Sequence, residues 1–176
     1  VYGVEEGNLI RAAAHADALK ELATDPQGLR AYWGRLSDAE RVLPRVAGAA
    51  AASFLRLGGD REAADIVAHA LSRHWDPALL AIYAACRVPE PVRQLEQAER
   101  WLPEHSQDAA LLPALGVLCQ RQQLWGKAQT YLEAALSLDA NARTHVALGE
   151  LLARLGRDGE ANAHFSAALK LALGDM

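Results

Sequence analysis

Apolar and small residues recur along this chain at helical spacing, and one block of them occurs twice. Four such positions in residues 108–141 return 33 residues further on: Gly116 as Gly149, Ala128 as Ala161, Leu132 as Phe165 and Ala135 as Ala168. Short side chains allow two antiparallel helices to approach closely, and large apolar side chains fill the remaining space. The repeated block therefore predicts pairs of short amphipathic helices.

The spacing in both copies matches the tetratricopeptide pattern, in which W-x2-L-G-x2-Y is followed by A-x3-F and P. The first copy fits this pattern with Leu112, Leu115, Gly116, Cys119, Ala128 and Leu132, and the second with His145, Leu148, Gly149, Leu152, Ala161 and Phe165. Both copies lack the first aromatic residue, and Ala140 stands where the closing proline belongs. We predict an all-α, tetratricopeptide-like α-solenoid of about four helix pairs behind leading N-terminal helices, wound into a right-handed superhelix.

The same pattern divides the chain into segments. We expect a single domain over residues 1–176, built from leading helices (1–43), repeat 1 (44–75), a degenerate repeat 2 (76–107), repeat 3 (108–141) and repeat 4 (142–173). Ser37 followed by Glu40 is a capping box, which predicts the start of a short helix. Pro44 fits the first turn of the next helix, and Gly58-Gly59 offers it a left-handed stop.

Repeat 2 departs from the pattern. We expect its first helix to begin near Pro77 and its second to continue through Leu95, Ala98, Trp101 and Leu102. Both helices cannot be placed on the repeat without an insertion or deletion. Repeat 2 is therefore predicted from position and length alone.

Charge and composition argue against several classes of protein. The net charge is -4 with acidic and basic residues interspersed, whereas nucleic-acid binding usually needs a basic stripe. Cys86 and Cys119 are too few for a disulfide framework, and each fits a helical pattern as a small apolar residue would. The longest uncharged runs fall short of the roughly 20 apolar residues that span a bilayer. The chain begins at Val1 without a signal-peptide pattern, as a fragment of a longer protein would.

Stacked helix pairs are expected to form a concave face lined mainly by the first helix of each pair. By repeat spacing we expect these residues on it: Arg45, Arg56, Val117, Gln120, Arg121, Val146 and Glu150. Such grooves commonly hold an extended segment or a helix of another protein. Three of the residues are arginines, which bind carboxylates bidentately. The alternative interpretation is that these charges belong to ordinary solvated helix faces.

Four longer strings carry a resemblance to a known family. They cover residues 29–58, 73–85, 94–138 and 144–165, and the most specific piece is LCQRQQLWGKA over residues 118–128. Together they resemble the C-terminal part of the bacterial HemY family. Ser106 stands where a proline is usual in that family.

The resemblance implies a tetratricopeptide domain behind two N-terminal membrane helices, in a bacterial inner-membrane protein associated with late protohaem synthesis. It implies a scaffold or adaptor that holds protein partners, either haem-biosynthesis enzymes or further copies of itself, on the cytoplasmic side. The same name is also used for an unrelated flavin-dependent oxidase. This chain lacks the glycine-rich dinucleotide fingerprint of such an enzyme.

A haem- or porphyrin-binding protein is the alternative hypothesis, because histidine and cysteine side chains can ligate haem iron. The candidate ligands are His69, His74, His105, His145, His164, Cys86 and Cys119. His145 and His164 belong to the two helices of the last pair and are expected to approach each other. Two side chains are fewer than the three or more ligands of an ordinary metal site. Surface or boundary positions are the simpler interpretation of the histidines, and packing is the simpler interpretation of the His145–His164 pair.

No motif in the chain points to catalysis. The sequence contains no G-x-S-x-G, H-E-x-x-H or Walker loop. Nearly every apolar position is also needed for stacking the helices. We therefore expect a non-catalytic interaction domain with no cofactor and no metal.

Overall fold

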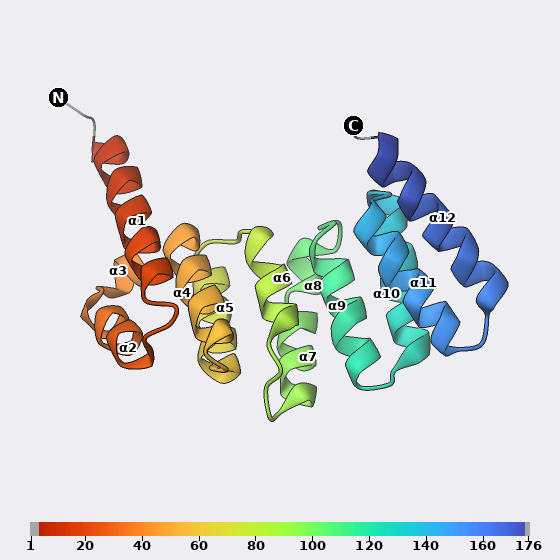
Figure 1. Cartoon of the computed structure of the whole chain (residues 1–176), viewed down its shortest axis with the longest axis horizontal. Coiled ribbons are helices and arrows are strands. Elements are labelled where there is room, and N and C mark those ends of the chain that lie inside the picture. Colours follow the sequence, from red (N-terminus) through yellow and green to blue (C-terminus); the bar gives the residue numbers. More distant parts are fainter. Residues whose placement is uncertain (1–3, 175–176) are drawn as a thin grey trace. The chain divides into compact units, whose positions relative to one another are not determined.

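The computed structural model describes residues 4–174, and within that range every regular element is an α-helix (Figure 1). This confirms the predicted all-α class. The helices are α1 (Val4–Glu21), α2 (Pro26–Arg35), α3 (Asp38–Arg41), α4 (Pro44–Arg56), α5 (Asp60–Arg73), α6 (Ala78–Ala85), α7 (Pro91–Glu99), α8 (Leu102–His105), α9 (Leu111–Arg121), α10 (Trp125–Leu138), α11 (Ala142–Arg154) and α12 (Asp158–Gly174). None of the described helices combines the length and the apolar character that crossing a bilayer requires.

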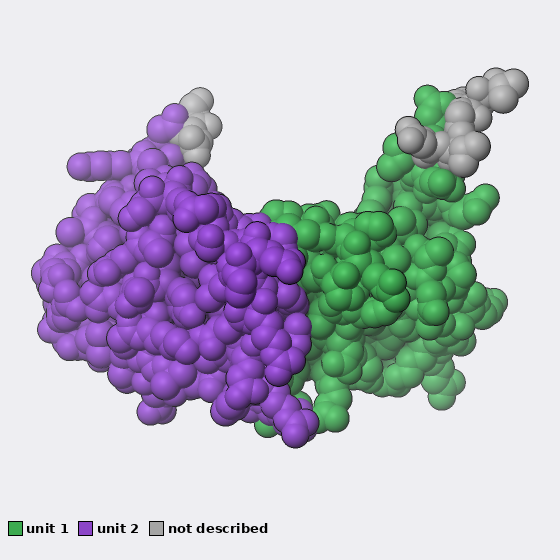
Figure 2. All heavy atoms as spheres, turned by 180° about the vertical axis from the view of Figure 1, so that it is seen from behind, with its two compact units in different colours: residues 1–89 green, residues 90–176 purple. Residues whose placement is uncertain are grey.

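The chain separates into two compact units, which Figure 2 shows in different colours. Unit 1 is residues 1–89 with α1 to α6, and unit 2 is residues 90–176 with α7 to α12. The boundary falls inside predicted repeat 2, where the sequence loses its register. The single domain, its repeat boundaries and its right-handed superhelix stay predictions. Residues 1–3 and 175–176 of the predicted domain lie outside the described range.

In unit 1, the long helix α1 packs against α4, which pairs with α5. The side of α1 that faces this core carries small residues and one leucine, including Ala16 and Leu19, which are fully buried. The buried Ser53 hydroxyl of α4 donates a hydrogen bond to the Leu19 carbonyl at 3.0 Å. The predicted capping box is confirmed, because the Glu40 N–H donates to the Ser37 hydroxyl and the Ser37 N–H donates to the Glu40 carboxylate.

In unit 2, α9 pairs with α10 and α11 pairs with α12, and glycine lies at both helix contacts. A Cβ added at Gly116 would lie 2.7 Å from Leu132 Cγ, and one added at Gly149 would lie 2.6 Å from Phe165 Cε1. Such distances are far below ordinary van der Waals contact. The predicted role of the repeated glycine, which is to let a large side chain of the second helix reach the first, is therefore confirmed.

Three helices end in the same left-handed turn. The turn residues are Gly58 after α4 (φ 76°), Gln123 after α9 (φ 58°) and Gly156 after α11 (φ 73°). In each turn the next N–H donates to a carbonyl five residues back: Gly59 to Phe54 at 2.8 Å, Leu124 to Cys119 at 3.0 Å and Arg157 to Leu152 at 2.9 Å. This is the Schellman arrangement, which satisfies carbonyls that a helix end leaves without partners. The left-handed stop predicted at Gly58-Gly59 is confirmed at Gly58, whereas Gly59 has a φ of -87° and caps α5.

One predicted helix is wrong in its extent. The second helix of repeat 2 was expected to continue through Trp101 and Leu102, but α7 ends at Glu99 and the separate short helix α8 begins at Leu102. Pro103 explains the break, because proline lacks an N–H and is accommodated in the first turn of a helix but not in its interior. Trp101 remains buried at the junction, with 9% of its surface exposed.

Candidate functional site

Helix α9 is buried on most of its surface and leaves a single partly exposed stripe. The stripe consists of Pro113, Val117, Gln120 and Arg121, whose spacing of four, three and one places them on one side of the helix. The opposite sides carry Leu111, Leu115 and Leu118, which are buried. A neighbouring molecule could therefore contact α9 only along this stripe.

Helix α11 has a corresponding exposed stripe. It consists of Arg143, Val146, Glu150 and Arg154, spaced by three, four and four residues. Val146 is 38% exposed, although valine is an apolar residue. The sides of α11 away from the stripe carry Leu148, Leu151 and Leu152, which are buried.

The two stripes lie side by side. The Gln120 side-chain amide of α9 donates a hydrogen bond to the Ala147 carbonyl of α11 at 3.3 Å, and the two helices contact each other. We call the joined surface the α9–α11 face and define it by Val117, Gln120, Arg121, Arg143, Val146, Glu150 and Arg154. Five of the predicted groove residues therefore lie together, and their part in binding stays a prediction.

The remaining two predicted residues belong to unit 1. Arg45 and Arg56 are exposed in the first and last turns of α4. Exposed Ala52 lies between them at helical spacing, so both arginines follow one stripe of α4. The structure places them on a first helix of a pair, as expected, but in a different unit from the α9–α11 face.

The charges of the α9–α11 face are mainly positive. Arg121, Arg143 and Arg154 carry guanidinium groups, and Glu150 carries the one carboxylate among the residues that define the face. Arg143 and Arg154 were not among the predicted groove residues. Both follow the same side of α11 as the predicted Val146 and Glu150, so their spacing could have found them.

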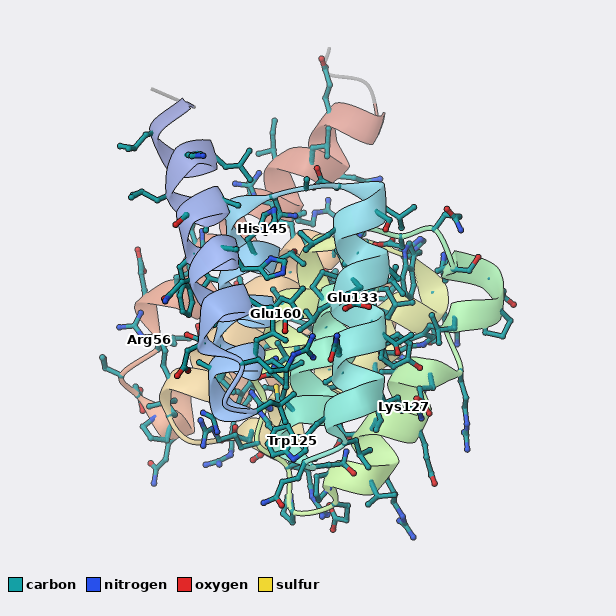
Figure 3. The ribbon with its side chains drawn as sticks, turned by 90° about the vertical axis from the view of Figure 1, so that its right-hand side faces the viewer. Arg56, Trp125, Lys127, Glu133, His145 and Glu160 are labelled. Carbon is teal, nitrogen blue, oxygen red and sulfur yellow. The ribbon has the colours of Figure 1, made fainter. Side chains whose placement is uncertain are left out.

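Next to this face lies His145 of α11, which Figure 3 labels. It is in contact with His164 of α12. Their Nδ1 atoms lie 2.9 Å apart and their ring centres 5.2 Å apart. The predicted approach of this pair is confirmed. Partial burial disfavours the imidazolium form and lowers the pKa of His145, and the neighbouring His164 lowers it further. Within the described residues, no three His, Cys, Asp or Glu side chains are grouped to hold a metal ion.

The other haem-ligand candidates lie at separate places. Cys86 and Cys119 are fully buried and do not form a disulfide, and burial raises the pKa of Cys119 to about 11. His69 is exposed on α5, and His74 is exposed at the C-terminal cap of this helix. His105 is half-buried at the end of α8.

Comparison with known proteins shows the fold. No protein-family model matches the chain, and no curated protein matches it. Solved structures of MamA do match: "MamA RS-1 ArsTM double mutant" is 17% identical with a TM-score of 0.61, covering 92% of this chain and 96% of that one. "MamA 41-end from Desulfovibrio magneticus RS-1" is 18% identical with a TM-score of 0.60, covering 93% and 96%. "MamA MSR-1 C2" is 15% identical with a TM-score of 0.57, covering 95% and 99%. The predicted tetratricopeptide-like α-solenoid is therefore confirmed.

The resemblance to the HemY family is wrong. No family model matches the chain, and the similar solved structures are those of MamA. The strings that carried the resemblance are rich in the alanine, leucine and glycine positions that any stacked array of such helix pairs requires. They identify the fold and not a family. The link to haem synthesis and the inner-membrane location therefore have no support.

Proposed function

We propose that this chain is a non-catalytic binding module that holds a segment of another protein on the α9–α11 face. The observation that carries the proposal is the joining of two exposed stripes, on helices that are otherwise buried, into one surface with both apolar and cationic residues. Repeat folds of this kind use such surfaces to bind extended segments or helices. The fold is shared with MamA, but a shared fold does not assign a partner.

The chemistry of the face favours an acidic segment with an apolar residue at its centre. Val117 and Val146 offer apolar contact, one from each helix. Arg121, Arg143 and Arg154 offer guanidinium groups, which bind carboxylates through two parallel hydrogen bonds. Because exposed charges are screened by salt, binding should weaken as the ionic strength rises.

The proposal can be tested with displayed peptides. A library of random 15-residue peptides would be selected on the 176-residue chain, and the enriched peptides would be measured by fluorescence anisotropy. We expect enrichment of aspartate and glutamate around an apolar residue. The double variant Arg143→Glu with Arg154→Glu should bind the enriched peptides at least about tenfold more weakly, because two carboxylate contacts become repulsive.

Arg100→Glu is the matched control, because Arg100 is an exposed arginine of unit 2 that follows α7 and lies outside the face. It should leave the affinity within about twofold of the unchanged chain. Equal binding by the double variant and the control would overturn the proposal. The double variant Arg45→Glu with Arg56→Glu tests in the same assay whether the predicted groove includes α4, and weaker binding would support that wider groove.

A further inference from the structure

Two histidine side chains bring ring nitrogens together on neighbouring helices. His145 lies in the first turn of α11 and His164 in the second turn of α12. Their Nδ1 atoms are 2.9 Å apart, and their ring planes are tilted by 37° to each other. Both side chains are half-buried, so small ions in the solvent can reach them. Imidazole is the commonest protein ligand of metal ions.

The two helices hold this pair of nitrogens in place. Asn141 caps α11, because its side chain accepts a hydrogen bond from a backbone N–H of the first turn. Phe165, the residue after His164, packs against Gly149, which lies one turn after His145. The contact that joins the helices therefore also fixes the backbone beneath both rings. Ligands on rigid elements lose less entropy when an ion binds them.

The separation of the two nitrogens favours one geometry of metal ion. A bond between an imidazole nitrogen and a metal ion is about 2.0–2.1 Å long, so two such ligands are about 2.9 Å apart at a right angle and about 3.3 Å apart at a tetrahedral angle. The observed 2.9 Å matches the right angle. Cu(II) and Ni(II) prefer square-planar or tetragonal sites of nitrogen and oxygen ligands, whereas Zn(II) prefers tetrahedral sites. The rings must turn to aim both lone pairs at one ion, but the helices need not move.

The protonation of the pair also suits a metal ion. Burial and the neighbouring His164 lower the pKa of His145, so the His145 ring is neutral at pH 7. Metal ions bind the neutral form of imidazole. In the hydrogen-bonded pair, one ring carries its proton on Nδ1. When an ion binds, this proton moves to Nε2 of the same ring, so both Nδ1 lone pairs face the ion.

Other side chains do not complete the ligand set. Within the part of the chain that the structure describes, no third His, Cys, Asp or Glu joins the pair in a group that could hold an ion. The Glu160 carboxylate, one turn before His164, accepts hydrogen bonds from the Arg157 guanidinium at 2.6 and 2.7 Å. Water therefore fills the remaining positions, and the ion is bound less tightly than in a site of three or more protein ligands.

We propose that His145 and His164 bind Cu(II) or Ni(II) through their Nδ1 atoms, with water in the other positions. The ion links α11 to α12, so it stabilises the folded chain more as its concentration rises. The binding uses no residue that defines the α9–α11 face, so it does not depend on the proposed peptide binding.

Isothermal titration calorimetry with NiCl2 tests the site, using the 176-residue chain after treatment with EDTA and its removal. We expect one Ni(II) per chain. His145→Gln and His164→Gln should each weaken the binding at least about tenfold, since even the loss of an outer-shell partner costs about that much. His69→Gln is the matched control, because His69 is an exposed histidine of unit 1, and it should leave the affinity within about twofold. Circular dichroism should show all three variants folded, because none of these side chains belongs to the buried core.

Two further measurements test the geometry and the link between the helices. Electron paramagnetic resonance of the Cu(II) complex should show coupling to two imidazole nitrogens, and zinc should bind more weakly than nickel because its tetrahedral angle needs a wider separation. Ni(II) should raise the urea midpoint of the unchanged chain and of His69→Gln, but not that of His164→Gln. A chain that binds no nickel, equal binding by His145→Gln and His69→Gln, or tighter binding of zinc than of nickel would each overturn the proposal.

Discussion

Gln123 adopts a backbone conformation that glycine adopts at the two equivalent turns, Gly58 and Gly156. The left-handed region costs a residue with a side chain roughly 1–2 kcal/mol. Glycine avoids this cost but loses about 0.5–1 kcal/mol more chain entropy on folding. We therefore predict that Gln123→Gly raises the free energy of unfolding by roughly 0.5–1 kcal/mol, measured by urea denaturation.

The reverse change at the equivalent turn is the control. Gly156→Gln should lower the free energy of unfolding by a similar amount, about 0.5–1 kcal/mol, because Gly156 has φ 73° and open space around its Cα. The prediction for Gln123 would be wrong if both variants shifted stability in the same direction.

The His145–His164 contact predicts a pH dependence of stability. The pKa of His145 is lowered in the folded chain, first by burial and then by His164. The folded state then binds fewer protons than the unfolded chain, so the stability from this group is present above the unfolded pKa of about 6.5 and is lost as the pH falls through it. We predict that the urea midpoint drops between about pH 7.5 and pH 5, and that His145→Gln makes this drop smaller.

A titration of the imidazole signals by NMR separates the two causes of this shift. Replacing His164 by Gln removes the neighbouring charge but leaves the helices around His145 in place. The pKa of His145 should therefore rise in His164→Gln and still stay below its ordinary value, since burial is the larger cause. An unchanged pKa would show that the two rings do not interact in solution.

At the scale of helices, the pairing of α11 with α12 depends on the absence of a side chain at Gly149. A Cβ there would lie 2.6 Å from Cε1 and 2.9 Å from Cδ1 of the Phe165 ring. An aromatic ring cannot bend away as an aliphatic chain can, so the helices or the ring must shift. We predict that Gly149→Ala lowers the free energy of unfolding by about 1–3 kcal/mol, the usual cost of overpacking.

Gly126 is the matched control for this prediction. It also lies in a helix, near the start of α10, and no atom lies within 4 Å of the Cβ that an alanine would add. Gly126→Ala should raise the free energy of unfolding by about 0.5–1 kcal/mol, because alanine is the better helix former. Equal effects at Gly149 and Gly126 in urea denaturation would mean that the close helix contact is not formed.

The sequence predicted the features that repeat, because repetition shows which positions the fold requires. Gly116 and Gly149 were placed correctly at helix contacts since each has a large apolar partner at the same distance along the chain. Arg154 was missed although it stands 33 residues after the predicted groove residue Arg121, so the repeat could have found it. Arg143 was missed because its counterpart 33 residues earlier, Ala110, carries no charge.

The family was predicted incorrectly for a related reason. The strings that suggested it contain many alanines, leucines and glycines at positions that stacking requires. Any chain that stacks helix pairs meets the same packing demands, so these positions contain little information about a partner or a pathway. The residues that differ between such proteins are the exposed ones, and a single sequence does not show which of them bind.

At the scale of the whole chain, the two compact units predict a separable fold. Unit 2 contains its own buried core, to which α9 contributes Leu115 and Leu118 and α11 contributes Leu148 and Leu151. In repeat proteins each pair is stabilised chiefly by its immediate neighbours. We predict that residues 90–176 produced alone are helical by circular dichroism and unfold in urea in one cooperative transition.

A shorter fragment provides the control for this prediction, because it lacks the contact between α9 and α10. Residues 125–176 contain α10 without α9, so Leu132 loses the space at Gly116 into which it packs. Exposing that buried leucine removes about 1.5–3 kcal/mol of hydrophobic stabilisation, in addition to the other apolar residues of α10. This shorter fragment should show less helix per residue and no cooperative transition. If residues 90–176 also showed no cooperative transition, the core of unit 2 would need residues 1–89 to fold. The helix pairs would then stabilise one another beyond their adjacent contacts.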